Sequence, residues 1–211
     1  WLKLIEQDFA DFMRFRYVLR NFVVTELKTR YQRSFLGFLW TMLNPVLMMT
    51  VLALVFSQIM NQRLSDYALY LFSGLIPWQL FSYSVNTGSR CLIAGEFLIK
   101  KIEIPKFLYP LNCVLVAAVD MLFGIGALFI LFKFLGARVH VQLVLVPIGI
   151  VFLAVFSLRL AMVAMTLVSR YRDFEHIIGV LLQALYFMSP ILYPREFMSK
   201  YPALVTWNPL S

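Results

Sequence analysis

Charged residues are scarce in this chain of 211 residues. Asp, Glu, Lys and Arg together make up 14% of it, whereas a soluble domain carries about a quarter. Hydrophobic residues make up 61%, and they fall in runs too long for the core strands or buried helices of a soluble fold. The composition therefore excludes an ordinary water-soluble enzyme and predicts an integral membrane protein.

Glycine, proline and cysteine are also few, and motifs of nucleotide and metal chemistry are missing. Nine Gly and nine Pro exclude low-complexity architectures. Cys91 and Cys113 have no second cysteine close by in the sequence, so we expect no structural disulfide. No Gly-x4-Gly-Lys-Ser/Thr phosphate loop or His-Glu-x-x-His motif occurs, and the charged cluster at 170–176 is more typical of capping than of a metal site. We expect no metal and no cofactor in this chain.

Five stretches are long and apolar enough to cross a hydrocarbon core of about 30 Å, which takes around 20 helical residues. They cover residues 36–60, 67–89, 107–132, 139–169 and 177–194. The sequence therefore predicts an all-α integral membrane protein with one transmembrane domain over residues 1–211.

The flanking segments have their own patterns. Apolar residues at positions 1, 2, 5, 9, 12 and 13 share one side of a helical wheel, which predicts an amphipathic helix on the inner membrane surface within a cytoplasmic segment 1–35. A helix that packs on a partner protein is the alternative. Residues 195–211 contain apolar pieces too short to cross, so we expect an external re-entrant segment, and the odd number of spans predicts a sixth span after Ser211 in the parent protein.

The basic residues are unevenly distributed between the loops. Alternate sides of the predicted spans hold thirteen and five Lys and Arg residues. Because basic residues are retained in the cytoplasm, the N-terminus and the loops at 90–106 and 170–176 are predicted to lie inside. This topology explains the net charge of +8, so nucleic acid is not an expected partner.

Two charged residues interrupt the third and fourth predicted spans. Asp120 and Arg159 each lie roughly 15 to 20 Å from the inner boundary at 1.5 Å per helical residue. A charge at mid-span is expensive and usually faces a partner or water. We predict an intramembrane ion pair between Asp120 and Arg159; the alternative is that each lines an aqueous path separately.

Four motifs follow one another along nearly the whole chain. They are Arg30 to Trp40 with Asn44-Pro45, Leu98 to Lys106 with Leu108 to Leu111, Arg170-Tyr171-Arg172-Asp173, and Ser189-Pro190 with Tyr193-Pro194 and Asn208-Pro209. In this order they resemble the membrane subunit of type-2 ATP-binding-cassette exporters that move lipid-linked polysaccharide.

The resemblance implies a permease in the inner membrane with a cytoplasmic N-terminus. It would pair with a second copy of itself and with separate ATPase subunits that hold ATP and Mg²⁺, and it would export an undecaprenyl-diphosphate-linked polysaccharide, foremost an O-antigen. It would thus be a transport subunit and not an enzyme.

The resemblance also assigns roles to individual residues. ATPase coupling falls on Gly95, Glu96, Phe97, Leu98, Lys100 and Lys101, and a substrate gate falls on Arg30, Tyr31, Arg33 and Ser34. An arginine can fork across phosphate oxygens, so the gate is chemically sensible. The alternative for these arginines is that they only anchor the first span inside.

Aromatic rings suit a sugar path because the C–H faces of a sugar stack on them. Tyr186, Phe187 and Tyr193 flank a Ser-Pro break and are the candidates, with membrane-interface anchoring as the alternative. Two other functions stay open: a membrane enzyme acting on polyprenyl phosphates, which would use the group around Glu175, and an exporter of drugs or small lipids.

Overall fold

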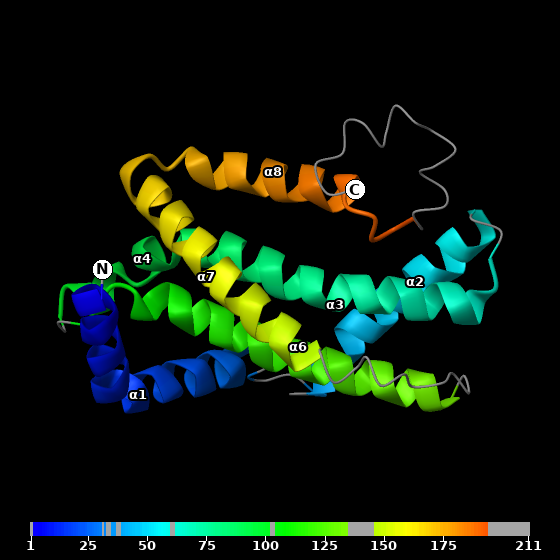
Figure 1. The fold of residues 1–211 in the computed structure, drawn as a ribbon, viewed down its shortest axis with the longest axis horizontal. Coiled ribbons are helices and arrows are strands. Elements are labelled where there is room, and N and C mark those ends of the chain that lie inside the picture. Colours follow the sequence, from blue (N-terminus) through cyan, green and yellow to red (C-terminus); the bar gives the residue numbers. More distant parts are fainter. Residues whose placement is uncertain are drawn as a thin grey trace.

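The computed structural model describes residues 2–30, 32, 35–36, 39–59, 62–101, 104–134 and 146–193, without the side chains of 2–13, 41, 42, 44, 45, 98 and 134. All secondary structure in these ranges is helical, which confirms the all-α class for them (Figure 1). The helices are α1 (Leu2–Arg30), α2 (Trp40–Ile59), α3 (Leu64–Ser89), α4 (Cys91–Ala94), α5 (Glu96–Ile99), α6 (Leu108–Phe134), α7 (Val146–Arg170) and α8 (Phe174–Met188).

The five predicted spans correspond in order to α2, α3, α6, α7 and α8. Of the described helices, α6 (over Leu108–Lys133) and α7 are long and apolar enough to cross a membrane, while Val46–Ile59 of α2 and α8 are apolar but shorter. Helix α3 has the length but not the hydropathy. Five crossings remain a prediction, and the re-entrant segment at 195–211 lies outside the described residues.

Helix α3 occupies the centre of the bundle. It packs against α2, α6, α7 and α8, and its sides supply residues to two of the three hydrophobic clusters. Figure 1 shows α7 crossing α3 obliquely. At that crossing, a Cβ added to Gly88 would lie 2.8 Å from the Cβ of Ala161, so the two backbones approach closely.

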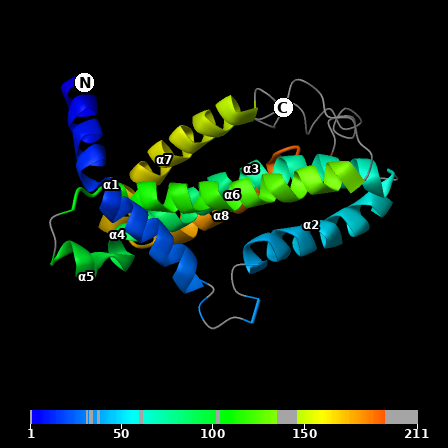
Figure 2. The same ribbon diagram turned by 90° about the horizontal axis from the view of Figure 1, so that it is seen from below.

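The two ends of the bundle carry different connections. The start of α1, the α4–α5 segment and the α7–α8 turn lie at one end, and the α2–α3 turn lies at the other (Figures 1 and 2). This is the arrangement that alternating crossings require. The three segments predicted to be cytoplasmic therefore share one end of the molecule.

The second half of α1 packs on the bundle. Leu19 is 3% exposed in a cluster with Tyr109 of α6, and the rings of Phe22 and Tyr109 lie 6.1 Å apart. This half of α1 therefore lies against α6. The predicted amphipathic face is formed by side chains of residues 1–13, which lie outside the described part of the structure.

Candidate functional site

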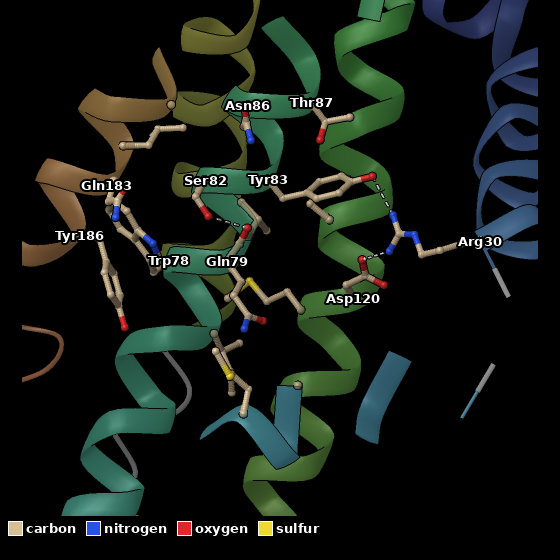
Figure 3. Close-up of a pocket in the computed structure, with 18 of the residues that line it drawn as sticks. Arg30, Trp78, Gln79, Ser82, Tyr83, Asn86, Thr87, Asp120, Gln183 and Tyr186 are labelled. Atoms are coloured by element: carbon tan, nitrogen blue, oxygen red, sulfur yellow. Dashed lines mark hydrogen bonds and ion pairs between the residues drawn. The ribbon is translucent and has the colours of Figure 1, made fainter. Parts of the chain in front are cut away.

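A cavity of about 680 Å³ lies beside α3. Its walls come from α3, α6 and α8, with contributions from α2 and from the last residue of α1. Figure 3 shows its polar and aromatic side chains: those of α8 and Trp78 lie on one side of α3, and Arg30 and Asp120 lie on the other. The cavity thus joins elements that are far apart in the sequence.

A polar stripe runs along α3 inside this cavity. Its members recur at steps of three and four, so they share one face of the helix. They are Gln79, Ser82, Tyr83, Asn86 and Thr87, and Gln183 of α8 adds a further amide. This stripe was not among the predicted features, although its spacing in the sequence could have revealed it.

Aromatic rings border the same cavity. Trp78 and Tyr186 both line it, with ring centres 5.6 Å apart. Of the three predicted path aromatics, Tyr186 is the one in the lining. Phe187 is 55% exposed, and half-buried Tyr193 donates its hydroxyl to the carbonyl oxygen of Phe187.

Asp120 is bound to Arg30 and not to Arg159, so the predicted intramembrane pair is wrong. The Arg30 Nη1 donates to Asp120 Oδ2 at 2.6 Å. Helix α7 turns Ser157 and Ala161 into the bundle, and Arg159 lies two residues from each, on the opposite side of the helix. Arg159 is accordingly exposed.

The Arg30–Asp120 pair belongs to a larger network that the sequence did not reveal. Arg30 Nη2 donates to the Tyr83 hydroxyl at 2.7 Å, and its guanidinium carbon lies 5.2 Å from the centre of that ring. The Tyr83 hydroxyl donates to Glu26 Oε1 at 2.9 Å, and Asn112 donates to Glu26 Oε2 at 2.6 Å. The network therefore ties the end of α1 to α3 and α6.

Arg30 is the predicted gate residue that the structure places. It lines the cavity at the point where α1 ends. Tyr31, Arg33 and Ser34 lie outside the described residues, so the remainder of the predicted gate keeps its status as a prediction.

The predicted coupling residues form a projection at one end of the bundle. Gly95 separates α4 from α5, and a Cβ there would lie 2.8 Å from Tyr109 Cε1, so the break packs tightly on α6. Phe97 is 67% exposed, and Lys101 Nζ lies 4.0 Å from the centre of its ring. The segment therefore presents an aromatic side chain flanked by basic residues.

Lys100 and Glu96 form an ion pair within this segment. Lys100 donates to Glu96 Oε1 at 2.6 Å. This hydrogen bond and the Lys100 charge lower the pKa of the Glu96 carboxyl, and Arg172 of the α7–α8 turn acts in the same direction. Glu96 therefore stays ionised throughout the neutral range.

The charged cluster at the start of α8 holds helices together. Arg90 at the end of α3 donates to Glu175 Oε1 at 2.9 Å. In the part of the chain that the structure describes, no group of three or more His, Cys, Asp or Glu side chains is placed to hold a metal ion. Glu175 is thus engaged in a link between α3 and α8.

Comparison with known proteins gives this geometry a context. Residues 17–211 match the family described as ABC-2 type transporter. Over 203 residues the chain is 33% identical to the O-antigen export system permease protein RfbA of Myxococcus xanthus. The aligned region covers 95% of this chain and 78% of that protein.

Two further relatives carry related names. An O-antigen export system permease protein RfbA of Klebsiella pneumoniae is 28% identical over 188 residues, and the polysialic acid transport protein KpsM of Escherichia coli is 28% identical over 196 residues. Each match covers 88% of this chain and 73% of the relative. The similarity therefore extends over most of both chains.

Proposed function

The chain belongs to the ABC-2 type transporter family, and from that premise we propose that it is the permease subunit of an exporter that moves a polysaccharide across a membrane. The relatives that it matches over most of their length are named for O-antigen export and for polysialic acid transport. A glycan of the O-antigen type is therefore the proposed cargo.

The lining of the cavity supports this class of cargo. Amides and hydroxyls on α3 and α8 can exchange hydrogen bonds with sugar hydroxyls, and the rings of Trp78 and Tyr186 can stack on sugar C–H faces. A hydrophobic drug or small lipid would displace water from the polar stripe without offering hydrogen bonds in its place. The stripe is the observation that favours a hydroxylated substrate.

The finer assignments follow from the family resemblance and are part of the proposal. The glycan travels on undecaprenyl diphosphate, the permease works as a pair of copies in the inner membrane, and separate ATPase subunits bind at the end that carries α5. The exposed Phe97 between charged neighbours supports a protein contact at that end.

Enzymatic action on polyprenyl phosphates has less support. The carboxylate best placed for acid–base work, Glu175, is held by Arg90 at 2.9 Å and lies at a helix start. A general acid or base must reach the substrate, whereas the Glu175 carboxylate is already bound to Arg90.

A complementation experiment tests the proposal. The full-length gene is expressed, with its ATPase partner gene, in a strain that lacks its own O-antigen permease, and glycan at the cell surface is measured by immunoblotting. We expect surface glycan only when both genes are present. Surface glycan without any ATPase, or none despite stable expression of both proteins, would contradict the proposed function.

A further inference from the structure

We propose that Arg30 is the phosphate-binding residue of the cavity and that Asp120 is its internal competitor, so that an anionic headgroup binds by taking Arg30 from Asp120. This inference rests on the proposed function, because it concerns how the phosphate of a lipid-linked cargo enters the site.

The charged residues of the cavity wall are already paired with each other. Among the described lining residues, Arg30 and Asp120 are the charged ones. They form an ion pair in which Arg30 Nη1 lies 2.6 Å from Asp120 Oδ2. Glu26 lies behind them with Oε1 3.9 Å from Arg30 Nη2, which makes two carboxylates around one guanidinium. An entering phosphate would therefore be repelled while Asp120 keeps its place.

The depth of the pair makes that charge balance matter. Asp120 lies twelve residues after Leu108, the first residue of α6, which corresponds to about 18 Å along the helix. The side chains of Arg30 and Asp120 are only 26% and 28% exposed. At such a position an unpaired charge is costly, so each change of partner must leave Arg30 matched by an anion.

The two carboxylates are held very differently. Both oxygens of Glu26 accept hydrogen bonds from neutral groups, Tyr83 and Asn112, so Glu26 stays satisfied without Arg30. Among the described residues, Asp120 accepts through Oδ2 alone, and its Oδ1 is buried without a hydrogen-bond partner there. Asp120 is therefore the weakly held partner and the one that can leave.

A phosphate is the stronger partner for the same guanidinium. Arg and phosphate commonly form two parallel hydrogen bonds, and a diphosphate carries more charge than one carboxylate. Asp120, once released, has no other cation paired with it among the described residues, and an unpaired carboxyl at this depth is least costly when protonated. An asparagine at position 120 imitates this released state.

A binding experiment tests the exchange. The full-length permease is placed in phosphatidylcholine nanodiscs, and equilibrium binding of radiolabelled farnesyl diphosphate is measured for wild type and variants. We expect Asp120→Asn to bind about tenfold more tightly than wild type, because it no longer competes for Arg30. Arg30→Gln should bind about tenfold more weakly, and the double variant should match Arg30→Gln.

The control and the probes separate the alternatives. Glu175→Gln removes a carboxylate paired with arginine outside the cavity, and it should bind like wild type. Inorganic pyrophosphate and farnesol form two further arms: a gain for Asp120→Asn with farnesyl diphosphate alone indicates a lipid-linked phosphate, and an equal gain with pyrophosphate indicates a free one. Asp120→Ser repeats the test if Asp120→Asn does not fold.

Two results would overturn the inference. Unchanged or weaker binding by folded Asp120→Asn removes the competitor role, and wild-type affinity in Arg30→Gln removes the phosphate role. Either result leaves the proposed function standing if complementation restores surface glycan. Failed complementation with the expected binding pattern would instead reject the proposed function alone.

Discussion

Tyr83 connects an acidic and a basic residue of α1, Glu26 and Arg30, to α3. Its hydroxyl accepts from Arg30 at 2.7 Å and donates to Glu26 at 2.9 Å, while its ring lies beneath the guanidinium. One hydroxyl therefore aligns an acid on α1 with the arginine that ends the same helix. Without it, Glu26 keeps Asn112, but Arg30 keeps fewer bonds to α3.

We predict that Tyr83→Phe lowers the thermal stability of the permease. The ring and its contact with Arg30 remain, but two hydrogen bonds to charged groups are lost, which costs about 1 to 3 kcal/mol. For a chain of this size the melting temperature should fall by roughly 2 to 10 °C, as measured by fluorescence-detected gel filtration after heating. Tyr171→Phe is the matched control, because Tyr171 is 56% exposed; equal melting temperatures for the two variants would contradict the prediction.

At the scale of the helices, the close contact of α3 with α7 depends on small residues. Gly88 lies opposite Ala161, and Ser157, Ala161 and Ala164 form much of the buried face of α7. Small side chains let two helix backbones approach within a membrane, where packing provides much of the attraction. The crossing of α3 and α7 is therefore sensitive to a single methyl group.

We predict that Gly88→Ala destabilises the bundle by about 1 to 3 kcal/mol, because its Cβ would lie 2.8 Å from a side chain that cannot move aside. The double variant Gly88→Ala with Ala161→Gly should recover most of the loss, since it moves the methyl group from one helix to the other. Gly126→Ala is the control: in the described part of the chain, no atom outside its own stretch of helix lies within 4 Å of a Cβ there, and alanine favours a helix. Thermal unfolding in detergent measures all three, and an unaffected Gly88→Ala would disprove the close contact.

The positions of the helices could be predicted from the sequence, but their rotations could not. Apolar runs in lipid must form helices, so run length located α2, α3, α6, α7 and α8, with each boundary within about seven residues of the observed one. Counting residues also placed Asp120 and Arg159 near the middle of α6 and α7. Depth leaves open which way a side chain points around its helix, and Arg159 points away from the bundle.

The partner of Asp120 needed a contact that no local pattern contains. Arg30 lies 90 residues away from Asp120 in the sequence. The two side chains meet because the second half of α1 packs against α6. The sequence favoured a helix on the membrane surface, since the apolar face of residues 1–13 resembles one. In the second half of α1, Leu19 and Phe22 pack against α6, and a pattern confined to residues 1–13 could not indicate that contact.

At the scale of the whole molecule, α6 connects the cavity beside α3 with the α4–α5 segment. The network at Asp120 and Asn112 lies on the same helix whose first turns hold the α4–α5 segment through Tyr109 and Gly95. Helix α1 contacts both regions, because Phe22 lies against Tyr109 and Arg30 against Asp120. We therefore expect a force applied by a partner at α5 to reach the cavity through the packed helices α1 and α6.

The exposed ring of Phe97 is where we expect that partner to bind. Truncating an aromatic anchor at the centre of a protein interface costs at least about 2 kcal/mol, so Phe97→Ala should retain less than about a tenth of the ATPase in affinity co-purification. Phe152→Ala is the control, because Phe152 on α7 is 73% exposed but lies within an apolar helix. Circular dichroism verifies that both variants keep their helices. Full ATPase recovery with Phe97→Ala, or equal losses in both variants, would remove the coupling role from α5, because the loss would then not depend on where the exposed ring lies.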